Sequence, residues 1–463
     1  KDGFLLKIII LGAGQVGSTL ANLLSQEDND VTVVDLDDKA LHHLEEEVDI
    51  NTINGSCTFP STLLSADIKN ADMVAAVTGS DEINIVSCLI SKILSRKVKT
   101  IARIRESSYL RQDTLKAIEE GVIPIDKVIS PENLITEYIQ ALIETPGSLQ
   151  VLEFGDGILN LVGTKAVNGG PLIGHEISDL KKYMPNVDTR VAAIFRDGNS
   201  IIPQGTTIIE AEDEVFFIAR RKDAKKVINA MRTKEDPYKF IIIAGGGKIG
   251  SSLAERIEGN HRVKVIENNT EKAKKVSERL INSIVLEGNV SDKSLLHEES
   301  VEEADVFVAV TNDDEANVMS CMLAKEMGAH KVIALINNQA YVDLMQGKAI
   351  DIDVSIAPSQ ITIGEFLSEL AGDDVVKVHS LRRGAAEAIE TIVKASNNSK
   401  EDVVGKELGS IKLPVGATIG AILRKNKAKI AHDNVKLREH DHVILFLTDK
   451  KILPQIQEIF SPA

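Results

Sequence analysis

The chain has 463 residues, of which 43% are apolar and 26% are charged, a balance typical of a folded protein that excludes a disordered one. Its formal net charge of −16 at pH 7 argues against binding to nucleic acid or to anionic lipid, because both require a basic face. The length is too great for one hydrophobic core, so several folding units and an internal repeat are expected.

The first predicted strand begins at Lys7, and residues Lys1 to Leu6 are interpreted as the remnant of an expression tag. The segment KIIILGAGQVGSTLA then predicts a buried strand, a glycine turn and the start of a helix. In this GxGxxG pattern the glycines permit a tight turn, the approach of a pyrophosphate and close packing of helix on strand. The predicted phosphate loop comprises Gly12, Ala13, Gly14, Gln15, Val16 and Gly17.

A second predicted strand, Val31 to Val34, ends on Asp35, which lies 23 residues after Gly12. This spacing suits a carboxylate that accepts hydrogen bonds from ribose hydroxyls. It favours NAD(H) or another adenosine nucleotide and disfavours the 2′-phosphate of NADP. The structural alternative is a solvated acid at the end of a strand.

Residues that follow the later strands should complete the site, because ligands of open α/β sheets lie at the carboxyl ends of the strands. Arg103 is suited to a phosphate or a ribose. The acidic runs Asp81-Glu82 and, in the second half of the chain, Asp313-Asp314-Glu315 could hold a cation, but a solvated helix N-terminus is the favoured interpretation of both. The predicted additions to the first site are Gly55, Ser56, Thr78, Gly79 and Arg103.

The chain repeats itself with a shift of 233 residues. The second copy begins FIIIAGGGKIGSSLA at Phe240, and DMVAAVTGSDEIN at Asp72 reappears as DVFVAVTNDDEAN at Asp305. Cys88 and Cys321 correspond, which predicts that both are small buried hydrophobes. Two later segments with strand-like alternation also match each other, TRVAAIFRDG at Thr189 and TIGAILRKNK at Thr418.

The second nucleotide site is predicted at the matching positions. Glu267 ends a strand 22 residues after Gly245, while Lys248 replaces Gln15 and Leu335 replaces Arg103, so the two sites should differ in ligand or affinity. Gly288, Asn289 and Asn312 follow the equivalent strands. The predicted residues of this site are Gly245, Gly246, Gly247, Lys248, Ile249, Gly250, Glu267 and Thr311.

The predicted fold class is α/β, with two Rossmann-like doubly wound parallel sheets, each followed by a small α+β domain, in a tandem duplication. Linkers are expected where proline and glycine gather, near Thr145-Pro146-Gly147, Glu235-Asp236-Pro237 and Ala371-Gly372-Asp373. The predicted domains are residues 7–137 and 238–368 for the Rossmann-like units, and 138–232 and 372–463 for the small units.

The segments KIIILGAGQVG, VVD at Asp35, DMVAAVT, TRVAAIFR and SLRRGAAEAIE at Ser380 resemble the TrkA family, the regulatory subunits of bacterial Trk potassium uptake systems. The resemblance covers the chain from Lys7 onward, including the duplicated RCK domain. It implies a cytoplasmic protein on the inner face of the membrane, a ring-like homo-oligomer, expected to be a tetramer, and a translocating partner of TrkH or TrkG type. It also implies binding of NAD(H), with ATP or ADP as further ligands.

The same resemblance matches Gly12 to Gly17, Asp35, Thr78, Gly79 and Arg103 to the first ligand site of the family. It matches Gly245 to Gly250, Glu267 and Thr311 to the second. The family begins with Met where this chain has Leu6, in keeping with the tag interpretation.

The alternative function is an NAD-dependent oxidoreductase with a reduced substrate domain. It would need a proton-transfer group above the nicotinamide, and the small units offer none. Their cluster of His432, His440 and His442 is interpreted as a polar strand face and not as a metal site. A pure scaffold would not explain two complete fingerprints, so a non-enzymatic nucleotide sensor without catalytic residues is predicted.

Overall fold

The computed structural model describes residues 6–25, 29–155, 157–338, 341, 351–370, 375–381, 386–395, 402–425, 427–448 and 450–461. The chain divides into two compact units, Lys1–Leu134 with Ile361–Phe366, and Ile135–Gln360 with Leu367–Ala463. Each unit is described by itself. The predicted linker at Ala371 to Asp373 lies outside the described residues, as do Lys1 to Leu5 of the proposed tag.

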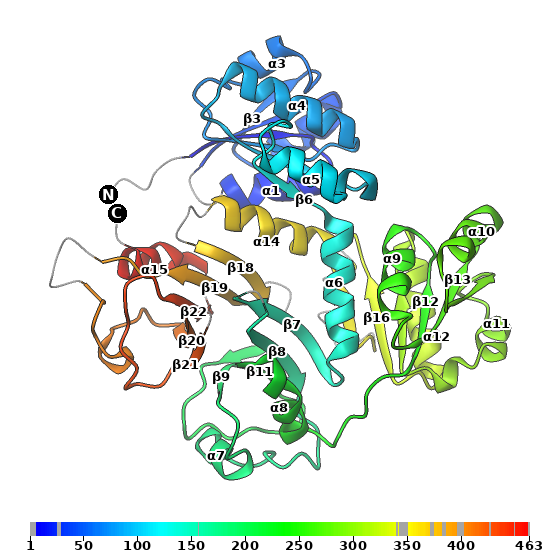
Figure 1. Cartoon of the computed structure of the whole chain (residues 1–463), viewed down its shortest axis with the longest axis vertical. Coiled ribbons are helices and arrows are strands. Elements are labelled where there is room, and N and C mark those ends of the chain that lie inside the picture. Colours follow the sequence, from blue (N-terminus) through cyan, green and yellow to red (C-terminus); the bar gives the residue numbers. More distant parts are fainter. Residues whose placement is uncertain are drawn as a thin grey trace. The chain divides into compact units, whose positions relative to one another are not determined.

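The first unit contains a six-stranded parallel sheet with the order β3-β2-β1-β4-β5-β6. Figure 1 shows this unit in blue to cyan, with β3 and β6 labelled. The order reverses direction between β1 and β4, the point at which ligands bind in doubly wound sheets. The strands are β1 (Lys7–Leu11), β2 (Asp30–Asp35), β3 (Asn51–Asn54), β4 (Met73–Ala76), β5 (Lys99–Arg103) and β6 (Lys127–Ile129). The helices are α1 (Gln15–Ser25), α2 (Asp38–Glu47), α3 (Pro60–Ser65), α4 (Asp81–Leu94) and α5 (Gln112–Glu119).

The same topology recurs in the second unit as the parallel sheet β14-β13-β12-β15-β16-β17. Its strands are β12 (Phe240–Ala244), β13 (Arg262–Glu267), β14 (Ile284–Glu287), β15 (Val306–Ala309), β16 (Lys331–Leu335) and β17 (Val354–Ile356). Its helices are α9 (Lys248–Ile257), α10 (Thr270–Arg279), α11 (Lys293–Glu298) and α12 (Asp314–Met327). The fold class predicted from the repeat is confirmed.

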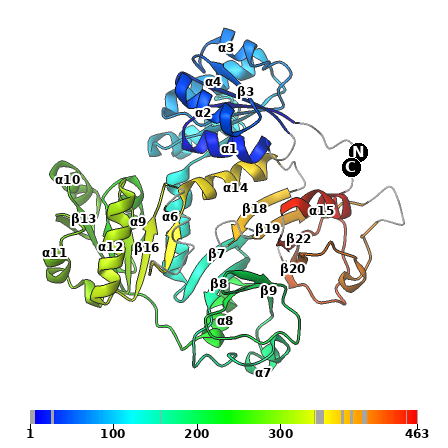
Figure 2. The same cartoon turned by 180° about the vertical axis from the view of Figure 1, so that it is seen from behind.

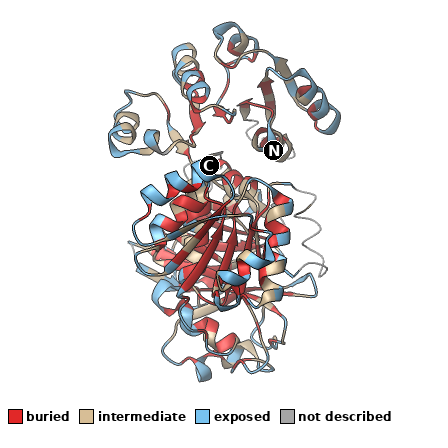
Figure 3. Ribbon diagram, turned by 90° about the vertical axis from the view of Figure 1, so that its right-hand side faces the viewer, coloured by how far each residue is buried: buried red, intermediate tan, exposed pale blue. Residues whose placement is uncertain are grey.

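The parallel strands are continuous apolar runs because helices cover both faces of such sheets. Strands β12, β15 and β16 are buried at every residue, and Figure 3 shows strands coloured as buried beside helices with exposed outer faces. The helices begin where short polar side chains satisfy free backbone N–H groups. Asp37 caps α2, Ser80 caps α4, and Asn269 and Asp313 cap α10 and α12.

Helix α6 (Pro131–Glu144) connects the first parallel sheet to the first small sheet, and it continues through the predicted boundary at residues 137/138. The small sheet is antiparallel, with the order β10-β9-β11-β8-β7. Its elements are β7 (Ser148–Phe154), β8 (Leu159–Lys165), α7 (Leu180–Tyr183), β9 (Thr189–Arg196), β10 (Asn199–Ile201), β11 (Glu214–Arg220) and α8 (Ala224–Met231).

The second small sheet repeats this arrangement as β18-β19-β22-β20-β21. It follows α14 (Pro358–Leu370) and comprises β18 (Val375–Leu381), β19 (Ala386–Ile392), β20 (Ala417–Arg424), β21 (Lys427–Ile430) and β22 (His442–Leu447), ending in α15 (Leu453–Phe460). The exact domain limits proposed from the sequence stay predictions.

The two small sheets share one hydrophobic core within the second unit. Phe154, Phe195 and Phe216 of the first sheet lie in the same cluster as Leu423 and Phe446 of the second. Strand β18 lies beside β7, as Figures 1 and 2 show from opposite sides, and the Gln150 Nε2 atom donates to the Ser380 carbonyl at 2.8 Å. The two modules therefore form a sandwich, a contact that the sequence pattern did not predict.

Candidate functional site

The two glycine loops follow β1 and β12 and open α1 and α9. Gly12 has φ +114° and Gly245 has φ +109°, backbone conformations that favour glycine. A Cβ atom on Gly17 would lie 1.8 Å from the Gly12 carbonyl oxygen, and one on Gly250 would lie 1.9 Å from that of Gly245. The third glycine of each loop is therefore required by helix packing, whatever the loop binds.

The second glycine of each pattern faces open space. A Cβ atom on Gly14 or Gly247 would meet no other atom within 4 Å. Both residues are exposed, and Gln15 and Lys248 beside them are exposed as well. This accessible backbone at the start of a helix is suited to an anion.

The strand-end acids reach back to the glycine loops. Asp35 accepts hydrogen bonds from the backbone N–H of Ala13 at 2.5 Å and of Asp37 at 2.9 Å. Glu267 accepts equivalent bonds from Gly246 and Asn269, each at 2.9 Å. Each acid thus bonds the backbone of its own glycine loop and of the turn after its strand, and the ligand role of Asp35 stays a prediction.

The acid and the loop residue vary together between the copies. Where the first copy has Asp35 and Ala13, the second has the longer Glu267 and the smaller Gly246. A Cβ atom on Gly246 would lie 3.2 Å from the Glu267 Cβ and Oε2 atoms. Glu267 is also 7% exposed, whereas Asp35 is half-buried. The second site thus presents a more enclosed carboxylate than the first.

The later residues of the first site lie at the same carboxyl edge of the sheet. Gly55 and Ser56 follow β3, Thr78 and Gly79 follow β4, and Arg103 is the last residue of β5. The Gly55 backbone N–H donates to the Asp35 carbonyl at 2.9 Å. The structure therefore places the predicted residues along the same carboxyl edge of the sheet.

Arg103 has an unused hydrogen-bond donor in this site. Its Nε atom is buried without a hydrogen-bond partner in the described part of the chain. Burial lowers the pKa of Arg103, while the nearby Glu132 carboxylate acts in the opposite direction. A half-buried guanidinium with an unused donor is suited to an oxyanion such as phosphate.

Two buried asparagines organise the sites and were missed as candidates. Asn84 accepts hydrogen bonds from the Thr78 N–H at 2.9 Å and the Thr78 hydroxyl at 2.7 Å, and its amide donates to the Arg103 carbonyl at 2.9 Å. Asn317 makes the same bonds to Thr311 and to the Leu335 carbonyl. The sequence signal that could have identified these asparagines is their repetition at matching positions, at the end of DEIN in the first copy and of DEAN in the second.

One aspartate in each acidic run is buried, and for these two residues the interpretation as solvated helix ends is wrong. Asp81 is 7% exposed and accepts from the N–H groups of Arg105 and Glu106 at 3.0 and 2.7 Å. Asp314 is 9% exposed and accepts from Asn337 and Asn338. Each aspartate holds the loop that follows β5 or β16.

The second site gathers its predicted residues in the same way but lacks the arginine. Thr311 and Asn312 follow β15, Gly288 and Asn289 follow β14, and Leu335 takes the place of Arg103. Leu335 is 4% exposed, so this corner of the second site is apolar. The predicted difference in ligand or affinity between the two sites stays a prediction.

The remaining reactive side chains lie elsewhere. Cys88 and Cys321 are fully buried at equivalent places, and burial raises the pKa of the Cys88 thiol to about 12, as expected for inert core residues. His432 contacts Asp188 at 2.9 Å and His442 contacts Glu390 at 2.7 Å. Each of these histidines thus has its own acidic partner.

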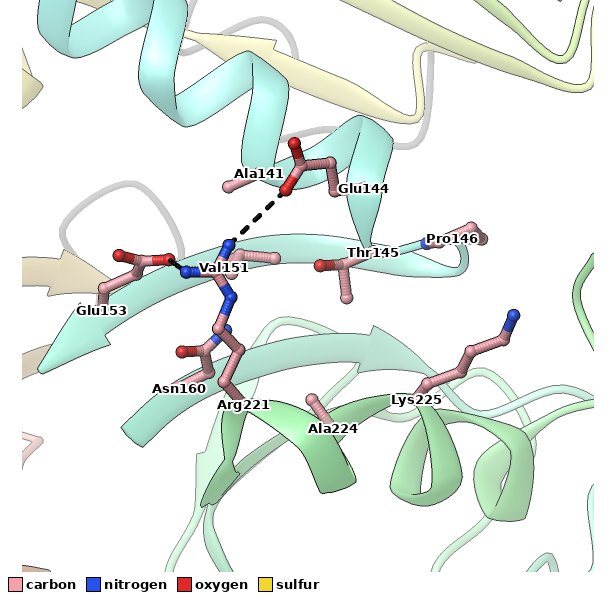
Figure 4. A pocket seen from close by; sticks show the side chains of 10 residues that line it. All are labelled: Ala141, Glu144, Thr145, Pro146, Val151, Glu153, Asn160, Arg221, Ala224 and Lys225. Carbon is pink, nitrogen blue, oxygen red and sulfur yellow. Dashed lines mark ion pairs between the residues drawn. The ribbon is translucent and has the colours of Figure 1, made fainter. Parts of the chain in front are cut away.

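A cavity of about 160 Å³ lies where the end of α6 meets β7, β8 and α8. Figure 4 shows Arg221 reaching between Glu144 and Glu153, to which it is paired at 3.6 and 3.4 Å. Lys225 adds a second positive charge, so acids and bases balance and no single ligand charge is favoured. None of the predicted site residues lines this cavity.

Within the described residues, no helix is both long and apolar enough to cross a membrane.

Comparison with protein families identifies the duplicated unit. The TrkA-N domain model matches residues 8–131 and again residues 241–358, and the TrkA-C domain model matches residues 164–232. The chain belongs to the TrkA family. The chain is also 50% identical over 456 residues to the Trk system potassium uptake protein TrkA of Halomonas elongata, a match that covers 98% of the chain and 99% of the relative.

A further TrkA relative, from Vibrio alginolyticus, is 48% identical over 458 residues and covers 99% of each chain. Among solved structures, the GsuK channel bound to NAD has a TM-score of 0.61 at 18% identity, covering 98% of this chain and 79% of the channel chain. The same channel bound to ADP has a TM-score of 0.50 at 16% identity, covering 80% and 70%. At this identity the channel shows the shared fold alone.

Proposed function

We propose that this TrkA-family chain is a non-enzymatic regulatory subunit that binds NAD(H) or adenine nucleotides and gates a membrane potassium uptake system of Trk type. The observation that carries the proposal is the pair of complete glycine loops, each with a strand-end acid at its edge. The relatives named above are potassium uptake proteins, and a channel of the same fold binds NAD.

The pyrophosphate would bind at the open backbone of Gly14, Gln15 and Val16, where α1 begins. Asp35 would exchange its bond to the Ala13 N–H for bonds to ribose hydroxyls. Arg103 would donate hydrogen bonds from its half-buried guanidinium to a phosphate oxygen of the ligand, which would give its Nε atom a partner. Thr78 and Gly79 lie beside this position, and Gly55 and Ser56 close the edge next to Asp35.

The second site would hold the same class of ligand with a different preference, through Gly245, Gly246, Gly247, Lys248, Ile249, Gly250, Glu267 and Thr311. Leu335 offers no charge to a phosphate. Ligands whose terminal phosphates need a cation should therefore prefer the first site.

The regulatory partner would be a potassium-translocating membrane subunit of TrkH or TrkG type, and the chain would act at the inner face of the membrane as a homo-oligomer, a tetramer in our proposal. Nucleotide occupancy would act by differential affinity for two arrangements of the protein, because a ligand shifts an equilibrium only in that way. Coupling of about 1–3 kcal/mol would change activity about 5–150-fold.

The test is the thermal stability of the full chain with NADH, NADPH, ATP and ADP, for wild type, Asp35→Ala and Glu267→Ala. Nucleotides that bind the folded state raise its melting temperature. NADH or an adenine nucleotide should stabilise the wild type more than NADPH does, and each variant should lose part of that shift. An absence of any shift in the wild type overturns the proposal, and turnover of NADH with carbonyl substrates would establish an oxidoreductase instead.

A further inference from the structure

A buried lysine links the second parallel sheet to the corner between α6 and β7. Lys331, the first residue of β16, is 5% exposed. Its Nζ atom donates to the Ser148 carbonyl at 2.7 Å and to the Leu142 carbonyl at 3.5 Å. All three residues belong to the second compact unit, so a side chain of one sheet holds the end of a helix and the start of a strand from another module.

Further polar contacts hold the turn that joins α6 to β7. Its residues Thr145 and Pro146 are labelled in Figure 4. The Gly147 N–H donates to the Tyr238 hydroxyl at 3.2 Å, and Arg232 donates to the Gly147 carbonyl at 3.2 Å. The Tyr238 ring lies 5.8 Å from the Lys331 Nζ atom. The turn is therefore fixed from both sides by one cluster.

The charged groups that face Lys331 do not neutralise it. Asp353 and Glu235 favour its ammonium form, whereas Arg232 and Lys325 oppose it. Asp353 is paired with Lys325 at 2.8 Å, and Glu235 is paired with Arg232 at 2.7 Å and with His330 at 3.1 Å. In the described part of the chain, the hydrogen bonds of Lys331 go only to carbonyl groups. Burial consequently lowers the pKa of Lys331 to about 7.

The first copy provides an internal comparison. Lys99 occupies the same register position in β5, since Lys99 pairs with Met73 as Lys331 pairs with Val306. Lys99 is only half-buried. The lysine is thus repeated in the two copies, and it is 5% exposed in the second copy but half-buried in the first.

We propose that Lys331 is a pH-sensitive latch, whose neutral amine holds the α6–β7 corner against β16 and whose protonation releases it. Between pH 7 and pH 10.5, Lys331 binds a proton more readily in the released corner than in the closed one. By linkage, the closed arrangement is therefore favoured as the pH rises through this range. His330 acts in the opposite sense, because its pKa is raised by Glu235 and their pairing strengthens as pH falls.

Strand β16 gives the latch a connection to the second glycine-loop edge. Its far end, the Leu335 carbonyl, accepts from Asn317, which in turn holds Thr311. Release at Lys331 therefore acts on the same strand that borders this edge. The latch itself does not depend on whether a nucleotide binds there.

Hydrogen exchange of the full chain at pH 6 and pH 8, corrected for the intrinsic exchange rates, tests the latch. Peptides spanning residues 142–150 and 330–335 should open up to about tenfold more often at pH 6 in the wild type, a change that the opposite effect of His330 reduces but does not cancel. Lys331→Met, which keeps the volume without the charge, should remove this dependence, and Lys99→Met should retain it. Lys331→Arg, which stays charged, should remain open at both pH values.

Equal protection of these peptides at the two pH values in the wild type would overturn the proposal. So would a tenfold change that persists in Lys331→Met. Because the wild-type comparison needs no variant, a folding defect in any of the three variants leaves the test intact.

Discussion

Arg103 is the side chain that most clearly separates the two predicted nucleotide sites. Replacing it with leucine gives the first site the residue that the second site already has. Hydrogen bonds to charged groups contribute about 1.5–3 kcal/mol, so Arg103→Leu should weaken binding of ATP or NADH at the first site about 10–150-fold. Titration calorimetry measures this change, and Arg96→Leu, which removes the same charge at an exposed position, should leave the affinity unchanged.

The pairing of Glu267 with Gly246 predicts a stability effect confined to the second copy. Gly246→Ala places a methyl group 3.2 Å from Glu267, and overpacking of this kind costs about 1–3 kcal/mol. Adding Glu267→Asp reproduces the combination found in the first copy and should restore most of the loss. Urea unfolding of the single and double variants checks this, and a double variant no more stable than Gly246→Ala would refute the steric explanation.

At the scale of elements, Asn84 and Asn317 connect the end of one strand to the loop after its neighbour. Asn84→Ala leaves the Thr78 N–H and the Arg103 carbonyl without this partner, and buried unsatisfied groups cost about 1–3 kcal/mol each. We expect a comparable loss for Asn317→Ala. Chemical denaturation measures both, and Asn70→Ala, an exposed asparagine that bonds only a neighbouring aspartate, should change stability little.

The parallel strands and the glycine loops could be predicted because their signals are local. Runs such as Ile8 to Leu11 specify a buried strand, and the order of strand, glycine turn and helix in both copies specifies where Asp35 and Arg103 should lie. Asp81 and Asp314 were misjudged because their partners are backbone N–H groups more than twenty residues away. Hydrophobic periodicity carries no information on such contacts.

At the scale of the whole molecule, the shared core of the two small sheets should make them unfold together. Phe446→Ala removes a 3% exposed ring from the cluster that contains Phe154, and such truncations cost about 3–5 kcal/mol. In calorimetry of the Phe446→Ala variant, both small sheets should unfold in one transition, at a lower temperature than in the wild type. Hydrogen exchange that accelerates in β19 and β22 but not in β8 and β11 would contradict a common core.

This sandwich and the Lys331 latch could not be predicted from the sequence for the same physical reason. Each joins segments that are distant along the chain: residues 150 and 380 in one case, and residues 148 and 331 in the other. The tandem repeat reveals which modules are equivalent, but the packing of one module on another depends on complementary surfaces that a single sequence does not display.

The proposed function requires that nucleotide binding to this chain regulates potassium uptake. The most direct measurement is potassium flux into vesicles that contain a Trk-type translocating subunit and this chain, with and without ATP or NADH. We predict that at least one nucleotide changes the flux severalfold with wild-type chain. Arg103→Leu, Asp35→Ala and Glu267→Ala together, which alter both sites, should abolish the response while the chain still binds the vesicles. A flux that is insensitive to every nucleotide, or a response that survives these three substitutions, would contradict the proposed function.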